Sequence, residues 1–173
     1  MGLMSLTAPE SFGSLKGATL YAAVVDGLAG NSLDTTSTYV GVTLPTPMDG
    51  LAVGAAYDYR FNGPNAVTSG NNWAYAVAGY LSYQATEKLK LNGRVDWTNG
   101  SNGTWYTSSS SYGGQNELIS YTFTTDYSLW ANVISRAELR WDHSLKSDRP
   151  YGGVSSPNDN NAVTLALNVI YRF

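Results

Sequence analysis

The sequence predicts an all-β fold, an antiparallel up-and-down transmembrane β-barrel of about eight strands. Three observations support this prediction. Apolar and polar side chains alternate along successive segments that are rich in Tyr, Trp and β-branched residues, as in strands with one apolar face. The connections between these segments are alternately long and short. No apolar run reaches the roughly 18 residues of a membrane-spanning helix, so strands are the elements expected to cross a bilayer.

The first three predicted strands show this alternation with increasing clarity. Residues 16–26 are the first, although the apolar run at 22–25 leaves the facing of its side chains open. Residues 37–44 follow a connection rich in Gly, Asn and Asp, and residues 45–50 hold the Pro and Asp-Gly signals of a tight turn. Residues 51–61 alternate apolar side chains with small or charged ones, which predicts a strand with two unlike faces.

The next four predicted strands repeat the pattern. Residues 73–84 carry aromatic side chains at both ends of one face and aliphatic ones between them, which is the pattern of an interfacial aromatic girdle. Residues 89–98 alternate almost without interruption. Residues 117–127 and 133–143 set aromatic or aliphatic side chains against Ser, Thr, Asp, Glu and Arg. Each segment therefore has one apolar and one polar face.

The last predicted strand is residues 162–173. Every second residue in it is apolar: Val163, Leu165, Leu167, Val169, Tyr171 and Phe173. The segment is longer than the roughly 5–6 residues of an ordinary strand, and it suits a tilted membrane-spanning strand, which needs about 9–11.

The predicted connections differ in length in a regular order. Those at 27–36, 62–72, 99–116 and 144–161 are long and polar, and those at 45–50, 85–88 and 128–132 are short. Outer-membrane barrels have short turns at the periplasmic end and longer loops outside, so both chain termini of an eight-stranded barrel are expected at the short-turn end. A soluble β-sandwich binding module is the alternative fold, because strand spacing alone permits it.

Charge and residue content restrict the function classes. The net charge is -3 and the pI is about 4.9, so no basic surface for nucleic acid is expected. The chain has no Cys and one His, so no thiolate chemistry, metal site or cofactor is predicted. His143 stands between Asp142 and Ser144, but successive side chains in a strand face opposite sides, so the three do not form a catalytic triad. The chain is not expected to be an enzyme.

Residues 1–14 lack the basic start and the apolar core of a signal peptide. An outer-membrane protein needs such a leader, so we expect the leader to lie outside this sequence. Residues 1–173 are therefore expected to be a single outer-membrane barrel domain or the C-terminal part of a longer barrel.

Several stretches of the second half resemble a known family. The stretches ISYTFTTDYSLWANVISRAELRWDHS and NNAVTLALNVIYRF resemble the C-terminal part of the OmpL-like β-barrel porin family of Gram-negative bacteria. A strand ending in DYSLW, one ending in RAELRWDHS and a terminal strand ending in YRF carry the resemblance, and SYQATEKLKLNGRVDW is similar to the preceding hairpin. The resemblance covers residues 73–173. It implies a passive pore, and it implies a longer barrel of which this chain is the C-terminal portion.

Charged side chains on the polar faces are predicted to point into the lumen, because an Arg or Lys facing lipid at the bilayer midplane costs about 2–4 kcal/mol. The predicted lumen-lining residues are Asp58, Arg60, Lys90, Arg94, Asp96, Asp126, Arg136, Glu138, Arg140, Asp142 and Arg172. In a small barrel they would form a wall of ion pairs without an open pore. In a wider barrel they would line water and set charge selectivity.

Aromatic side chains on the other faces are predicted to contact the membrane. They are Tyr57, Tyr59, Trp73, Tyr75, Tyr83, Trp97, Tyr121, Trp141, Tyr171 and Phe173. The leading functional prediction is an outer-membrane porin-type channel for passive diffusion of small hydrophilic solutes. The alternative is a small closed eight-stranded barrel with a structural or surface-binding role through its long extracellular loops. The expected partners are the lipid bilayer, the solutes and the barrel-assembly machinery, and the number of chain copies stays open.

Overall fold

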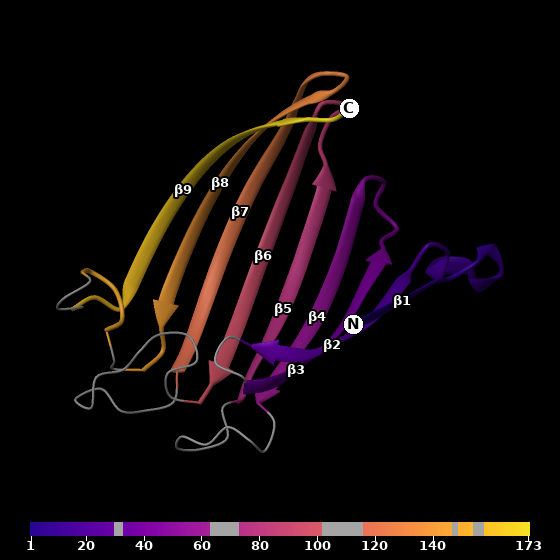
Figure 1. Cartoon of the computed structure of the whole chain (residues 1–173). Helices are drawn as coiled ribbons and strands as arrows, with labels where there is room; N and C mark the ends of the chain where they lie inside the picture. Colours follow the sequence, from indigo (N-terminus) through magenta and orange to yellow (C-terminus); the bar gives the residue numbers. More distant parts are fainter. Residues whose placement is uncertain (30–32, 63–72, 102–115, 147–148, 154–157) are drawn as a thin grey trace.

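The computed structural model shows one antiparallel β-sheet, and it describes residues 1–29, 33–62, 73–101, 116–146, 149–153 and 158–173 (Figure 1). Strand order along the sheet follows chain order. The strands are β1 (Gly2–Thr7), β2 (Thr19–Ala29), β3 (Leu33–Pro45), β4 (Leu51–Asn62), β5 (Trp73–Gln84), β6 (Leu89–Gly100), β7 (Asn116–Trp130), β8 (Val133–Ser144) and β9 (Asn161–Tyr171). A 3₁₀ helix, η1 (Glu10–Leu15), connects β1 to β2. The predicted all-β, up-and-down antiparallel architecture is confirmed.

The sheet has 9 strands rather than the predicted eight, because residues 2–7 form a strand that the sequence pattern does not indicate. β1 pairs with β2 from Gly2 opposite Val24 to Thr7 opposite Thr19. All of its side chains are exposed, and the strand is too short to show a clear alternation. Backbone pairing with the otherwise open edge of β2 therefore accounts for β1 better than side-chain packing does.

The odd number of antiparallel strands makes the two edge strands, β1 and β9, run in the same direction. Gly2 lies opposite Val24, in the middle of β2, whereas Tyr171 lies opposite Val133, beside the turn between β7 and β8. The C-terminus therefore lies at the short-turn end, and the N-terminus lies partway along the sheet (Figure 1). The expectation that both lie at the short-turn end is wrong for this reason.

From β3 onward, short turns and longer connections lie at opposite ends of the sheet, whereas the longer connection at 8–18 lies at the short-turn end. The short turns at 46–50, 85–88 and 131–132 lie at one end, and the strand ends that the longer connections join lie at the other (Figure 1). The predicted long loop at 27–36 is wrong, because β2 continues to Ala29 and β3 begins at Leu33. These polar strand ends pair regularly, and the Thr36 hydroxyl donates to the Asp26 carboxylate at 3.0 Å.

The register of the strands places residues of the same kind next to each other on each face of the sheet. On one face Val77 of β5 lies opposite Tyr57 of β4 and Trp97 of β6. On the other face Asp96 of β6 lies opposite Ala78 and Ser120. Because a slip of one residue would turn every side chain of a strand to the other side, this register keeps one face apolar and the other polar.

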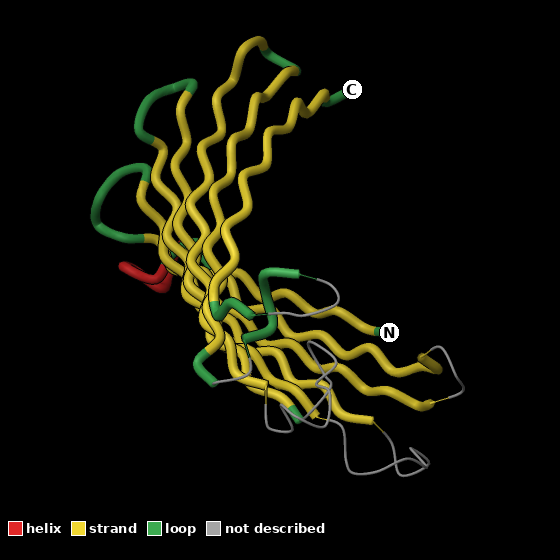
Figure 2. The backbone as a smooth tube through the Cα atoms, turned by 90° about the vertical axis from the view of Figure 1, so that its left-hand side faces the viewer, coloured by secondary structure: helices red, strands yellow, loops and turns green. Residues whose placement is uncertain are grey.

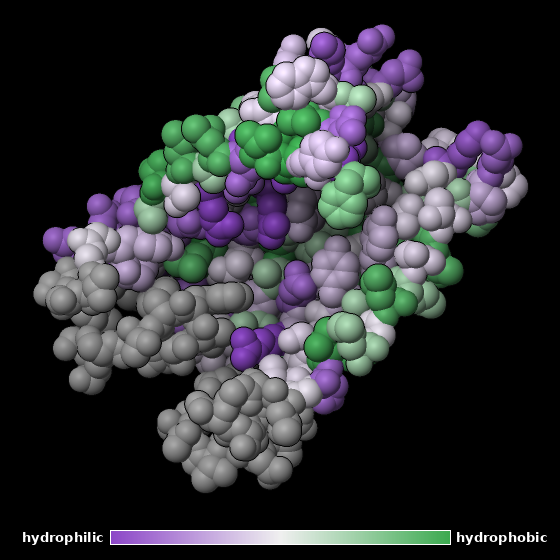
Figure 3. Space-filling view, turned by 45° about the horizontal axis from the view of Figure 1, so that its top comes forward, coloured by the Kyte–Doolittle hydropathy of each residue, from purple (hydrophilic) through white to green (hydrophobic). Residues whose placement is uncertain are grey.

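The sheet is bent into a trough, which is open on the side between its two edge strands (Figure 2). The polar face is the concave one, because its side chains are crowded: Ala78 is 3% exposed, and Asp96 and Ser120 are also buried. The apolar face is convex and uncovered, with Leu165 68% and Leu167 74% exposed. The space-filling view shows hydrophilic side chains near the hollowed centre and hydrophobic ones along the flanks (Figure 3).

The sheet does not close on itself. Within the described residues β1 pairs with β2 alone and β9 with β8 alone, so the predicted closed barrel is not formed by these strands. The described ranges also contain no second sheet over either face, which excludes the two-layer β-sandwich as the fold of this part of the chain. Its buried hydrophobic residues are three alanines, Ala56, Ala74 and Ala78, so this part of the chain has no conventional apolar core.

Candidate functional site

The concave face carries two copies of an Arg-x-Asp motif on β6 and β8. Arg94 and Asp96 form the first copy, and Arg140 and Asp142 form the second. β7 lies between them, with Thr122 opposite both arginines and Ser120 opposite both aspartates. Residues two apart in a strand face the same side, so each motif places a cation and an anion next to each other on the concave face.

Each motif forms an ion pair along its own strand. The Arg94 Nε donates to both carboxylate oxygens of Asp96 at 2.7 Å, and the Arg140 Nε donates to those of Asp142 at 2.9 and 3.0 Å. Ser120 connects the second pair to β7, because its hydroxyl donates to Asp142 and accepts from the Arg140 Nη2 at 3.2 Å. The Arg94 guanidinium also lies 5.2 Å from the centre of the Tyr80 ring, a cation–π distance.

A third ion pair crosses between strands nearer the short-turn end. Arg136 of β8 lies directly opposite Asp126 of β7, and its Nε and Nη2 donate to the two carboxylate oxygens at 2.6 and 3.0 Å. Lys90 of β6 lies opposite Asp126 on its other side. The Thr124 hydroxyl donates to Glu138 at 3.1 Å. The charged side chains of three strands thus form one connected polar surface.

A hollow of about 400 Å³ lies on this surface between the ion pairs. Its charged lining comprises Lys90, Arg94, Arg140 and Glu138. Its uncharged polar lining includes Tyr80 and Thr124. The charged and hydroxyl side chains of this lining are suited to non-covalent binding of a polar solute.

The remaining predicted lumen residues lie outside β6 to β8. Asp58 and Arg60 are on β4, opposite Ala76 and Ala74 and hence on the same face as the ion pairs. Arg172 follows the end of β9, where its backbone N–H donates to the Asn132 carbonyl. Register thus brings the strand members of the predicted set to one face of the sheet. Their role as the wall of a lumen stays a prediction.

The predicted membrane-facing aromatics on the strands lie on the convex face and gather at two levels. At the level of the long connections, Tyr75 contacts Trp73 and Trp97 with ring centres 5.7 and 5.3 Å apart, and Tyr121 stacks on Trp141 at 5.6 Å. The same level holds Tyr57, Tyr59, His143 and the unpredicted Phe61. The level of the short turns holds Tyr83, Tyr171, Phe173 and two unpredicted aromatics, Tyr127 and Trp130. The alternation of faces along β7 places Tyr127 on the apolar face. It does not place Trp130 there, because the register shifts between Ser128 and Trp130.

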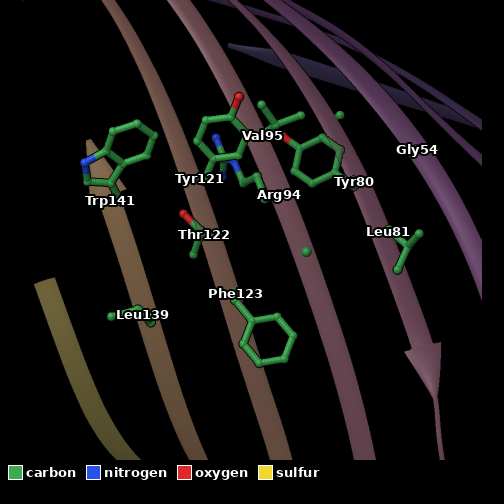
Figure 4. A pocket seen from close by; sticks show the side chains of 12 residues that line it. Gly54, Tyr80, Leu81, Arg94, Val95, Tyr121, Thr122, Phe123, Leu139 and Trp141 are labelled. Carbon is green, nitrogen blue, oxygen red and sulfur yellow. The ribbon is translucent and has the colours of Figure 1, made fainter. Parts of the chain in front are cut away.

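A second hollow, of about 630 Å³, interrupts the apolar face (Figure 4). Gly79 and Gly93 lie where neighbouring strands carry large side chains, among them Leu81, Val95 and Phe123. A methyl group added at Gly93 would meet no atom within 4 Å. The missing side chains of these glycines therefore help to leave this surface hollow.

The connection between β8 and β9 approaches the ion pairs from the end of the trough. Tyr151 and Asp159 bridge to each other, and burial near the Arg140–Asp142 pair raises the pKa of the Tyr151 phenol. Hydrogen bonds from the backbone and side-chain amides of Asn161 lower the pKa of the Asp159 carboxyl.

The residues around His143 do not come together as a triad in the described structure. Ser120 and Asp142 face the trough, whereas His143 is on the opposite face, where its Nδ1 lies 2.9 Å from the Asn161 side-chain oxygen. No cluster of three His, Cys, Asp or Glu side chains suited to a metal ion occurs in these ranges. The same ranges hold no helix that is long and apolar enough to cross a membrane.

A comparison with protein families agrees with this architecture. The model of the family described as "Putative beta-barrel porin-2, OmpL-like" matches residues 11–173. No curated protein and no solved structure gives a significant match. The family match includes β2 to β9 and so extends well beyond the residues that carry the resemblance in the sequence. Because the match spans nearly the whole chain, this protein belongs to the OmpL-like β-barrel porin family.

Proposed function

We propose that this chain forms the wall of a water-filled channel in the bacterial outer membrane, through which small hydrophilic solutes diffuse without a chemical step. The observation that carries the proposal is the pairing of an uncovered apolar convex face with a charged concave face on one curved sheet. Hydrocarbon is the environment that stabilises a face with Leu165, Leu167 and Val169 fully outward, and water is the one that stabilises the ion pairs.

An open channel is favoured over a small closed barrel because the described sheet does not close on itself. An eight-stranded barrel has an interior that side chains just fill. Here the curve stays open after 9 strands, and a hollow of about 400 Å³ remains on the concave face. In a bilayer the free backbone groups of β1 and β9 require pairing with further strands, which would enlarge the barrel. Such strands would come from another copy of the chain or from additional polypeptide, joined by the barrel-assembly machinery.

Two measurements on the detergent-purified protein test this proposal. A folded barrel migrates differently on a gel before and after boiling, so we expect heat-modifiable mobility. Reconstitution into planar bilayers should then give stepwise conductance. If the protein shows heat-modifiable mobility but the bilayers do not conduct, the channel proposal is wrong. That result would favour the closed barrel with a structural or surface-binding role. Purification as a stable monomer in detergent-free buffer would overturn the membrane location as well.

A further inference from the structure

We propose that the channel selects small anions, because its concave face presents arginine side chains to the solute and keeps their carboxylate partners against the sheet. This inference rests on the proposed function and names its solute class. Net charge does not suggest it. The chain carries a net charge of -3, and the predicted inward groups are nearly balanced between cations and anions.

The two members of each ion pair lie at different depths. The Asp96 side chain is 5% exposed and that of its partner Arg94 is 48% exposed. The Asp142 and Arg140 side chains are 16% and 42% exposed, and those of Asp126 and Arg136 are 15% and 38% exposed. In all three pairs on β6 to β8, the arginine therefore extends into the trough and the aspartate lies close to the sheet.

Side-chain length and local hydrogen bonds explain this difference. An aspartate carboxylate is held one carbon from its Cα, close to the backbone, where Ser120 donates to Asp142 and Asn92 donates to Asp126. An arginine has a longer stem and reaches past its partner while its head stays in water. Each pair is therefore a dipole whose positive end is nearest to a passing ion, and the nearer charge dominates the Coulomb energy.

Two of the three positive ends, those of Arg94 and Arg140, line one hollow together with Lys90. Glu138 is the one carboxylate among its lining residues. Arg94 and Arg140 lie in the same cross-strand row, separated by Thr122. A guanidinium offers a planar set of donors that matches carboxylate and phosphate groups. Small carboxylates and phosphates are therefore the solutes that this hollow fits best.

The reversal potential of the full-length protein in planar bilayers under a KCl gradient tests the inference. We expect chloride to be more permeant than potassium. The paired variants R94Q/D96N and R140Q/D142N keep the net charge of the chain. Each of them neutralises one arginine that extends into the trough and the aspartate that it pairs with. The chloride-to-potassium permeability ratio should fall roughly twofold to fivefold in each, the size expected for one unit charge acting a few ångströms away through water.

A matched control neutralises an ion pair outside the trough. Lys16 and Glu10 form a salt bridge at η1 with both side chains well exposed. The variant E10Q/K16Q should keep the wild-type reversal potential. Heat-modifiable mobility shows whether each variant folds. If one paired variant does not fold, the other still tests the inference.

The outcomes separate this inference from the proposed function. Bilayers that stay sealed with the wild-type protein overturn both. Conductance with a preference for potassium overturns the anion inference and leaves the channel intact. So does a permeability ratio that stays unchanged in both folded paired variants, because the ion pairs would then be structural only.

Discussion

Ser120 and Thr122 occupy successive inward positions on β7, but their hydroxyl groups differ in their contacts. The Ser120 hydroxyl is buried and donates to the Asp142 carboxylate. The Thr122 hydroxyl is buried without a hydrogen-bond partner among the described residues. We expect Ser120→Ala to lower the free energy of unfolding by about 1.5–3 kcal/mol, because it removes a hydrogen bond to a charged group. Thr122→Val should cause no loss, because it removes an unpaired polar atom. Urea titration in lipid vesicles measures both, and equal losses would contradict the assigned contacts.

Gly93 and Gly54 make a second matched pair. A Cβ at Gly93 would meet nothing within 4 Å, whereas a Cβ at Gly54 would lie 2.9 Å from the Val42 carbonyl oxygen. We expect Gly93→Ala to raise the free energy of unfolding by about 0.5–1 kcal/mol, through reduced backbone entropy of the unfolded chain. Gly54→Ala should lower it, because the backbone must shift. The same urea titration checks both signs, and destabilisation by Gly93→Ala would show that its hollow is filled.

At this scale the sequence predicts which face a side chain takes but not what it touches. Parity alone assigns Arg140 and Asp142 to one side, and register confirms that they share it with Arg94. The contacts of Ser120 with Asp142 and of Tyr80 with Arg94 depend on strand register and on rotamers. Neither is visible in the order of residues along the chain.

At the scale of the element, β9 offers the clearest test of its two faces. Leu165 projects from the convex face, and the adjacent Ala166 lies on the concave face opposite Glu138. We expect Leu165→Arg to lower the free energy of unfolding in vesicles by about 2–4 kcal/mol, the cost of a cation in the lipid-facing midplane. Ala166→Arg should cost much less, because it faces water and a carboxylate. A similar loss in both variants would contradict the assignment of the faces.

The sequence predicts the long strands of this protein better than the short one. The strands from β4 to β9 are found where alternation extends over many residues, and their ends differ from prediction by a few residues at polar positions such as those of β7. β1 is missed, because six residues give too short a pattern and its pairing depends on the free edge of β2. Polar strand ends are missed as well, because hydrogen bonding continues after the apolar pattern stops.

At the scale of the whole molecule, composition and patterning predict the all-β membrane architecture, but curvature and closure come from the arrangement of strands. β1 and β9 run in the same direction because the strand count is odd, and the described sheet is not closed between them. Neither property can be read from residues 162–173 or from any other single segment. The convex face is nevertheless predominantly apolar on every strand from β4 to β9, and this continuity supports contact with lipid.

The central claim is that hydrocarbon contacts the convex face and water contacts the concave one. Because the chain has no Cys, single cysteines can be introduced at 163–169 of β9 and spin-labelled one at a time in lipid vesicles. Labels at 163, 165, 167 and 169 should be accessible to oxygen dissolved in the bilayer. Labels at 164, 166 and 168 should instead be accessible to a water-soluble nickel complex. Equal access of the nickel complex to both sets of positions would contradict the account.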